Sequence, residues 1–267
     1  MRQITSRQNP IVRLFRETAD NPDSSGARLL LDGAHLVREA RDAQLTFASV
    51  VVAASRLQTD TEEGRLAATL ERNGVEVTSA SDQVFAAVSP VRTPSGIVAI
   101  ADRQPATVEA ICASPTPFVL IVVDVQDPGN VGAIVRVAEA AGVTGVLVCG
   151  ASANPFSWKA LRGSMGSLLR MPTAGRLPTE DAIASVANVG MRTVAATARG
   201  GREPDAVNWS GPAALVLGGE GPGLSDDVIA RCDERVTIPM SAPVESLNVS
   251  VAAAILVYAA RRQRHHT

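Results

Sequence analysis

The sequence predicts an α/β protein with two domains. Short β-branched or apolar runs alternate with helical patterns along almost the whole chain of 267 residues, as in layered α/β structures. The expected strand Phe118–Asp124 is apolar up to its final aspartate, which is typical of a buried parallel sheet. A proline-rich stretch precedes it. We therefore expect a smaller domain over residues 1–104, a linker over 105–117 and a larger domain over 118–267.

The charged residues carry no net signature of nucleic-acid binding. The chain has 27 acidic and 25 basic residues, a net charge of −2, and 46% of its residues are hydrophobic, enough for real cores. Lys159 is the only lysine, and all other basic residues are arginine. Arginine suits bidentate phosphate contacts. A GC-rich genome, which favours arginine codons, is the simpler explanation of the same bias, so the arginine excess alone does not indicate phosphate binding.

Cysteine usage and hydropathy indicate a cytoplasmic protein. The three cysteines are far apart, and none forms a CxxC pair, so we expect no structural zinc site and no other metal. An odd number of dispersed cysteines fits a reducing compartment. The chain begins without an apolar signal segment, and its longest apolar run, 249–260, is too short to span a bilayer. We expect a soluble protein with no membrane partner.

The N-terminal half begins with a basic segment. Residues 1–16 contain four arginines and no acid, and a helix is expected after Asn9 because Pro10 suits a first helical position. Such a helix could hold phosphate, with Arg7 and Arg13 as candidates, or be a solvated amphipathic helix. A lone histidine such as His35 is more often structural than catalytic. The other expected elements are strands Arg28–Leu31, Phe47–Ala53, Val75–Val77 and Ile97–Ile100, and helices Ala34–Arg41, Thr61–Arg72 and Asp82–Val88.

The C-terminal half begins with a βαβ unit, which points the start of a helix at the strand ends. Gly129–Gly132 at that start lacks the G-x-G-x-x-G spacing, and no acidic residue ends the second strand, so a dinucleotide site is disfavoured. Arg162–Ser167 is rich in small residues and could approach a phosphate, or form a tight packing turn. The expected elements here are strands Phe118–Asp124, Val143–Cys149, Arg192–Ala196, Ala213–Leu217 and Arg235–Ile238, and helices Val131–Ala141, Ser157–Arg162 and Thr179–Val186. A last, alanine-rich helix is expected to start near Ser246 and Asn248 and to end in the basic stretch 261–264.

Three short segments of this half place polar or charged residues at the end of a strand or the start of a helix. The first contains Asn130, placed to cap its helix, and Arg136, which lies six residues on and about 240° round the helix. The second is the glycine-rich turn 218–223, whose only charge is Glu220. The third is 238–251, where Ser246 and Asn248 precede an apolar helix. Free N–H groups at that helix start could hold a ligand, or Ser246 could be a simple N-cap.

Taken together, in this order and spacing, these segments resemble the SpoU (TrmH) family of RNA ribose 2′-O-methyltransferases, within the SPOUT superfamily. The resemblance implies an α/β SPOUT domain with a deep trefoil knot, S-adenosyl-L-methionine as cofactor, and a homodimer whose site is completed across the dimer. The segments Thr5–Pro10 and Leu31–Val37 are similar to the 23S rRNA branch, which includes thiostrepton-resistance methyltransferases. The N-terminal half accordingly resembles an RNA-binding substrate domain, similar to ribosomal proteins that bind kinked RNA.

The resemblance also implies roles for individual residues. Arg136 would engage the ribose 2′-oxygen, and because a free guanidinium stays protonated, it would act foremost as an orienting donor. Asn130, Glu220, Ser246 and Asn248 would hold Arg136, ribose and cofactor. The expected cofactor-site residues are Leu217, Gly218, Gly219, Ile238, Met240 and Leu247, and the expected RNA contacts are Arg7, Arg13, Arg162 and Ser164.

One departure from the family pattern lies in the third segment. Ala242, followed by Pro243, stands where the family usually has glycine, and this puts individual cofactor contacts of that loop in question. The substrate expected from the resemblance is 23S rRNA. The alternatives are tRNA as substrate, or a non-catalytic RNA-binding or ribosome-assembly factor.

Overall fold

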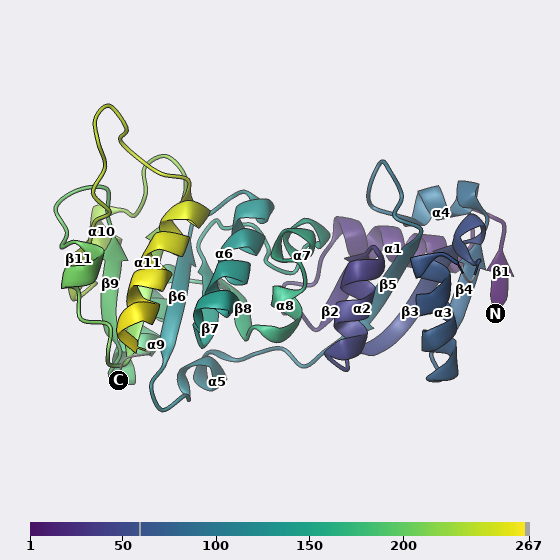
Figure 1. Ribbon diagram of the computed structural model, residues 1–267, viewed down its shortest axis with the longest axis horizontal. Coiled ribbons are helices and arrows are strands. Elements are labelled where there is room, and N and C mark those ends of the chain that lie inside the picture. Colours follow the sequence, from purple (N-terminus) through teal and green to yellow (C-terminus); the bar gives the residue numbers. More distant parts are fainter. Residues whose placement is uncertain (59, 265–267) are drawn as a thin grey trace.

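The computed structural model describes residues 1–58 and 60–264, which form two α/β halves that lie side by side (Figure 1). One half is built on a five-stranded sheet and the other on a six-stranded sheet. A continuous cluster of buried apolar side chains runs from one half into the other. The α/β class predicted from the alternation of strands and helices is therefore confirmed in both halves.

The N-terminal sheet has the strand order β1-β4-β3-β5-β2. Only β5 runs antiparallel to its neighbours, so β1 to β4 all end at the edge where β5 begins. The loops after these four strands and the loop 89–96 before β5 therefore share one edge. The strands are β1 (Arg2–Ile4), β2 (Arg28–Asp32), β3 (Thr46–Ala53), β4 (Val77–Ala80) and β5 (Ile97–Asp102), and the helices are α1 (Pro10–Asp20), α2 (Ala34–Asp42), α3 (Glu62–Arg72) and α4 (Asp82–Val88).

The C-terminal sheet is wholly parallel, with the order β11-β9-β10-β6-β7-β8. Its strands are β6 (Phe118–Val123), β7 (Gly145–Cys149), β8 (Thr173–Leu177), β9 (Arg192–Ala196), β10 (Ala213–Gly218) and β11 (Glu234–Val236). Helices α6 (Pro128–Ala141) and α11 (Val249–Arg264) cover one face, and α5 (Val108–Cys112), α9 (Thr179–Asn188) and α10 (Asp226–Ala230) cover the other. Alternate residues of β6, such as Leu120 and Ile121, enter the two opposite cores.

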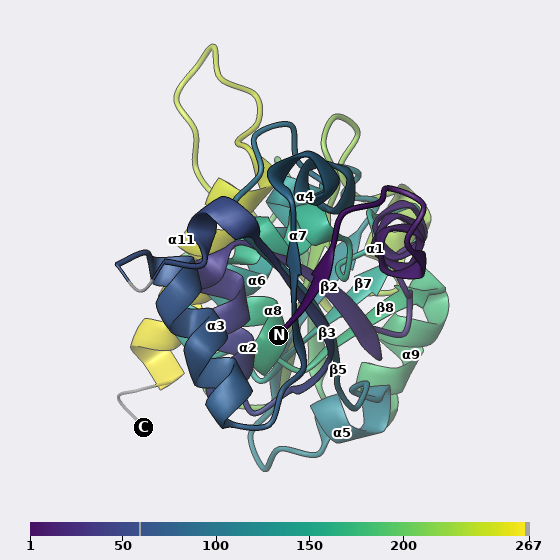
Figure 2. The ribbon, with the colours of Figure 1, turned by 90° about the vertical axis from the view of Figure 1, so that its right-hand side faces the viewer.

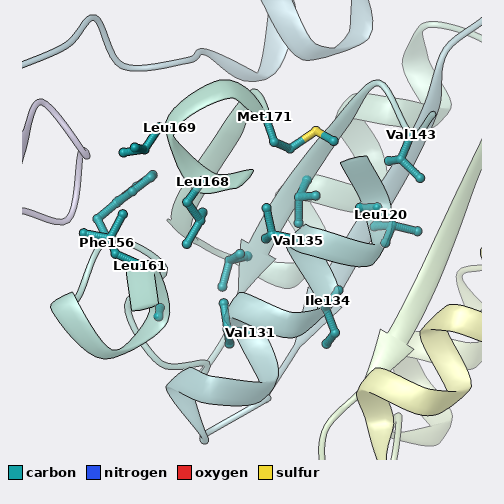
Figure 3. Close-up of a cluster of buried hydrophobic side chains, with 14 of the residues drawn as sticks. Leu120, Val131, Ile134, Val135, Val143, Phe156, Leu161, Leu168, Leu169 and Met171 are labelled. Carbon is teal, nitrogen blue, oxygen red and sulfur yellow. The ribbon is translucent and has the colours of Figure 1, made fainter. Parts of the chain in front are cut away.

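Helix α6 is the central element of this half. Its buried side, which includes Val131 and Val135, packs against β6 and against the short helices α7 (Trp158–Ser164) and α8 (Ser167–Arg170) (Figure 3). Gly132 permits this packing, because a Cβ there would lie 2.4 Å from the carbonyl oxygen of Ala160. The N-cap is Asp127, whose carboxylate accepts from the Asn130 N–H at 2.9 Å. The expectation that Asn130 itself caps this helix is therefore wrong, and its side chain is left for other contacts.

The two halves are joined by three arginines. Arg103 donates to the carbonyl oxygens of Gly26 (3.0 Å) and Leu168 (2.9 Å), and its guanidinium lies 4.9 Å from the ring centre of Phe156. Burial lowers the pKa of Arg103. Arg162 donates to Asp32 across the boundary, and Arg170 bridges Glu39 of the N-terminal half and Glu139 of α6. Apolar and ionic contacts together fix one half against the other.

The structure also departs from the sequence-based prediction. The segment 105–117, expected to be a linker, contains α5, and Ile111 is buried in the core of the C-terminal half. The strand expected at Val75–Val77 lies at Val77–Ala80, where it pairs with β1 and β3. Elements that the prediction omitted are β1, β8, α5, α8 and α10, and each has only three to five residues. Elements this short contain too few residues for the period of their apolar side chains to be recognised in the sequence.

Candidate functional site

A cavity of about 540 Å³ lies at the carboxyl ends of the central parallel strands. Its walls come from the ends of β9, β10 and β11, from the start of α11 and from the loop between β11 and α11. In open parallel sheets this edge is the usual place for a ligand. All six residues predicted for the cofactor site line the cavity, namely Leu217, Gly218, Gly219, Ile238, Met240 and Leu247, and so do Glu220, Ser246 and Asn248.

Close backbone packing explains the glycines of the turn after β10. A Cβ on Gly219 would lie 2.0 Å from the carbonyl oxygen of Asp124, and one on Gly218 would lie 2.4 Å from the amide nitrogen of Leu224. Gly221 has φ +91°, in the left-handed region that glycine favours. The glycines thus let the β10 turn close onto the end of β6, which brings backbone groups to the cavity wall.

Three side chains from three separate segments form one hydrogen-bonded chain beside the cavity. The amide of Asn130, in the first turn of α6, donates to the carboxylate of Glu220, in the β10 turn. The amide of Asn248 donates to Asn130 Oδ1 at 3.2 Å. Asn248 Oδ1 also accepts from the backbone N–H of Ser250 at 2.9 Å, so Asn248 caps the start of α11. The structure therefore brings together the predicted residues of all three motifs.

Ser246 and Arg136, the other two residues predicted to be catalytic, are not part of this hydrogen-bonded chain. Ser246 lines the cavity from the exposed loop 241–248, and the capping role considered for it belongs to Asn248. Arg136 is exposed on α6 and is not among the residues that line the cavity. Within residues 1–58 and 60–264, no hydrogen bond or ion pair engages its guanidinium. A single chain thus assembles the site around Asn130, but it leaves Arg136 free on the outer surface of α6.

The loop that carries the family departure is the most exposed part of the site. Residues 241–248 are all exposed, and the Ala242–Pro243 peptide bond is cis. The residues on either side of this stretch, Met240 and Val249, still line the cavity. The departure at Ala242 therefore leaves the two ends of the loop in place at the cavity wall.

The four residues predicted to contact RNA have different surroundings. Arg7 is exposed in the turn between β1 and α1, and Arg13 is exposed and lies 3.4 Å from Glu17. Arg162 is held by Asp32 at 2.5 Å. Ser164 is fully buried, and its hydroxyl donates to the Leu161 carbonyl.

The prediction of a phosphate contact at Ser164 is therefore wrong. Arg162–Ser164 belongs to α7, which packs on α6, rather than to an open loop. The alternative reading of this segment, tight packing, is the correct one. Two further arginines, Arg56 after β3 and Arg92 in the loop 89–96, are exposed at the edge of the N-terminal sheet where β1 to β4 end.

Other classes of site find no support in the part of the chain that the structure describes. No group of three or more His, Cys, Asp or Glu side chains there could hold a metal ion. Among the same residues, no helix is long and apolar enough to cross a membrane. The three cysteines are free thiols, and burial raises the pKa of Cys149 to about 12 and that of Cys232 to about 11. Such thiols are poor nucleophiles at neutral pH.

Comparison with known proteins agrees with this geometry. A model of the SpoU rRNA methylase family matches residues 117–258, and a model of the MRM3-like substrate binding domain matches residues 24–99. The 23S rRNA (guanosine(2553)-2′-O)-methyltransferase RlmP of Bacillus subtilis is 30% identical over 97% of this chain and 98% of its own. A Synechocystis sp. protein named as an uncharacterized tRNA/rRNA methyltransferase is 31% identical over 98% of this chain and 94% of its own.

Solved structures give the same assignment. An rRNA methyltransferase from Sinorhizobium meliloti with AdoMet bound superposes with a TM-score of 0.83, covers 98% of this chain and 97% of its own, and is 27% identical. An RNA 2′-O ribose methyltransferase superposes with a TM-score of 0.81 over 98% and 99% of the two chains, at 30% identity. The family match covers just over half of the chain and includes all three motifs. The chain belongs to the SpoU rRNA methylase family.

Proposed function

We propose that this protein transfers a methyl group from S-adenosyl-L-methionine to a ribose 2′-oxygen of RNA. The observation that carries the proposal is the hydrogen-bonded chain of Glu220, Asn130 and Asn248 at the rim of the cavity. These three residues come from the three motifs on which the family resemblance rests. A non-catalytic RNA-binding protein with this fold would not need these three polar side chains to be hydrogen-bonded together at the rim of the cavity.

The cavity fits the cofactor in size and in lining. Its volume of about 540 Å³ lies within the range of roughly 300–1,000 Å³ that is usual for small-molecule sites. Leu217, Ile238 and Leu256 offer apolar surface, and the glycine-rich turn offers backbone groups to polar atoms. When bound, the cofactor supplies a methyl group that its sulfonium has already activated, so the protein has mainly to position the nucleophile. Positioning of this kind can contribute up to about 7–11 kcal/mol.

Several residues of this chain can position the ribose and its 2′-oxygen. Asn130 is fixed from both sides, by Glu220 and by Asn248, so its amide has a defined orientation for a ribose hydroxyl. Ser246, on the exposed loop, can donate to the same ribose or to the cofactor. A guanidinium such as that of Arg136 remains protonated, and we assign it the role of orienting the 2′-oxygen and stabilising charge there.

We infer that the active unit is a homodimer, because Arg136 is out of place in one chain. The outer surface of α11 exposes Val251 (48%), Ile255 (39%) and Tyr258 (44%), three large apolar side chains spaced along one side of the helix. The neighbouring outer surface of α6 carries Arg136. A second copy packed on this surface would cover the apolar side chains, and Arg136 of one chain would then approach the cavity of the other.

The substrate that we propose is 23S rRNA, with tRNA as the second candidate. Full-length similarity to RlmP favours the first, and the Synechocystis relative carries both RNA classes in its name. We also infer that the C-terminal half contains a deep trefoil knot, as the family resemblance implies. The test of that inference is a trace of the closed backbone in an experimental structure of this chain.

The proposed activity is tested by titration calorimetry and by a methylation assay. Isothermal titration with S-adenosyl-L-methionine should show one site per chain, and absence of binding would reject an enzymatic role. The Arg136→Ala variant should keep cofactor binding and lose methyl transfer. Normal turnover by that variant would remove Arg136 from the mechanism.

A further inference from the structure

A second hollow, of about 730 Å³, lies between the two halves of the molecule. Its N-terminal wall is formed by α1 and the end of α4, and its C-terminal wall by the starts of α6 and α7. Figure 2, viewed along the long axis, shows α1, α4 and α7 grouped around this region. We refer to it as the interdomain groove. It shares no lining residue with the cofactor cavity.

The groove combines cationic side chains with an apolar lining. Lys159, the only lysine of the chain, is exposed here, and its ammonium lies 5.5 Å from the ring centre of Trp158. Arg16 is exposed on the facing helix, and its Nε donates to the Ala87 carbonyl at 2.9 Å. The single acidic side chain of the lining is Asp20, so the charges sum to +1. The apolar lining includes Pro22, Pro90 and Pro128.

The groove opens beside the reaction site. Pro128 is part of its lining, and Asn130, two residues further along the same helix start, is the centre of the polar chain at the cofactor cavity. The groove is also lined by Ser89 and Pro90, which begin the loop 89–96. That loop and the loop 237–248 rise from the same side of the molecule (Figure 1). A chain-like ligand that reaches both the reaction site and the N-terminal edge would pass this groove.

We propose that the interdomain groove holds a single-stranded segment of the substrate RNA adjacent to the methylated ribose. Lys159 and Arg16 contact its phosphates, and the proline-lined floor receives a sugar or base. Sites for single-stranded nucleic acid commonly combine cations that follow the backbone with apolar faces for the bases. This inference rests on the proposed function, and it adds a specific contact surface that neither motif nor family match identifies.

The single lysine makes a direct test possible. A limiting amount of an amine-acylating reagent labels only Lys159 and the N-terminal amine of Met1, which lies 3.5 Å from Glu71 at the far end of the N-terminal half. The protein is labelled alone, with an unmodified 23S rRNA transcript, and with heparin at equal phosphate or sulfate charge. Peptide mass spectrometry then measures acylation of both amines. We expect the transcript to reduce labelling of Lys159 at least fivefold and to leave Met1 unchanged.

Two outcomes would overturn the proposal. The first is full labelling of Lys159 while a gel shift shows that the transcript is bound. The second is equal protection by heparin, which would indicate a general anion surface. A Lys159→Glu variant should raise the KM for RNA about tenfold, with unchanged affinity for S-adenosyl-L-methionine.

The matched control for that variant is Arg72→Glu. Arg72 is exposed at the end of α3, on the opposite edge of the N-terminal sheet. Its reversal should leave the KM unchanged, and an equal effect of both reversals would reject a local contact at Lys159. Failure of the proposed function looks different, because the RNA would then receive no methyl group whether or not Lys159 is protected.

Discussion

The ion pair between Arg162 and Asp32 should make a large contribution to the stability of the whole molecule. The Asp32 side chain is only 1% exposed, whereas that of Arg162 is 47% exposed. Asp32 Oδ2 accepts from Arg162, and Oδ1 accepts from the hydroxyls of Ser95 (2.9 Å) and Ser89 (3.3 Å). Replacement of Arg162 by methionine keeps an unbranched chain close in length to the aliphatic part of arginine, and it removes the guanidinium and its charge. It leaves a buried carboxylate with only two neutral donors.

The expected cost follows from these surroundings. Loss of one partner of a buried pair costs about 3–5 kcal/mol, because the other charge stays buried. Arg162 is half in solvent and Asp32 keeps its serines, so we expect a smaller loss, roughly 2–3 kcal/mol in the free energy of unfolding. For a chain of this size that corresponds to a decrease in Tm of about 4–12 °C. Asp32→Asn removes the buried charge, and Arg162→Met should cost less in that background.

Thermal unfolding of the four proteins of this double-mutant cycle measures the effect. The two losses should be non-additive by about 1–2 kcal/mol, in the direction of a smaller combined loss. An Arg162→Met variant within about 0.5 kcal/mol of the parent would show that Arg162 does not hold the carboxylate. Strict additivity would show that the two side chains act independently. Either result would refute the reasoning about the contact between the halves.

Further predictions concern the cofactor turn, the thiols and acid stability. Gly219→Ala should weaken binding of S-adenosyl-L-methionine more than tenfold in calorimetry, because the new Cβ would lie 2.0 Å from the Asp124 carbonyl oxygen and would displace the turn. The control is Gly211→Ala, whose Cβ meets nothing within 4 Å. Equal affinities of the two variants would contradict the packing argument. Cys149 is fully buried with a pKa of about 12, so a thiol reagent at pH 8 should label it only after unfolding, and rapid labelling of the native protein would contradict its burial. The Thr193 backbone N–H and hydroxyl lower the pKa of Asp233, so its stabilising effect is present above the ordinary aspartate pKa of about 3.9 and is lost as pH falls below it. Asp233→Asn should therefore flatten the decrease in unfolding free energy at acid pH in urea titrations, and an unchanged acid slope would argue against this linkage.

Most of the fold could be predicted from the sequence because its longer elements have clear periods. The strand β6 is an unbroken apolar run, and the end of α6 is marked by Gly142, which has φ +78°. The elements that were missed gain their stability from partners distant in the chain. Helix α5, for instance, has five residues, and Ile111 on it is buried only because α9 and β7 pack against it. The pattern of apolar and polar residues within a short segment does not reveal such long-range contacts.

The candidate site divides in the same way. A ligand site at this edge could be predicted because glycines and polar residues follow the ends of parallel strands, which meet there, whereas the individual lining residues came from the family resemblance. The surroundings of Arg162 and Ser164 could not, since both depend on how α7 packs between α6 and the N-terminal half. The family resemblance grouped Arg136 with Asn130, although a spacing of six residues turns it about 240° round the helix. In the structure Arg136 is exposed on α6 and takes no part in the polar chain of the same molecule. In the homodimer that we propose, a second copy would bring this guanidinium to the site.

The most direct test of the account is transfer of a labelled methyl group in vitro. Purified protein is incubated with methyl-labelled S-adenosyl-L-methionine and with unmodified 23S rRNA or bulk tRNA, and the labelled nucleotide is then mapped and hydrolysed. The account predicts label on a ribose 2′-oxygen of 23S rRNA, and loss of that label in the Asn130→Ala variant. Label on a base, or no transfer to either RNA by protein that binds the cofactor, would contradict it.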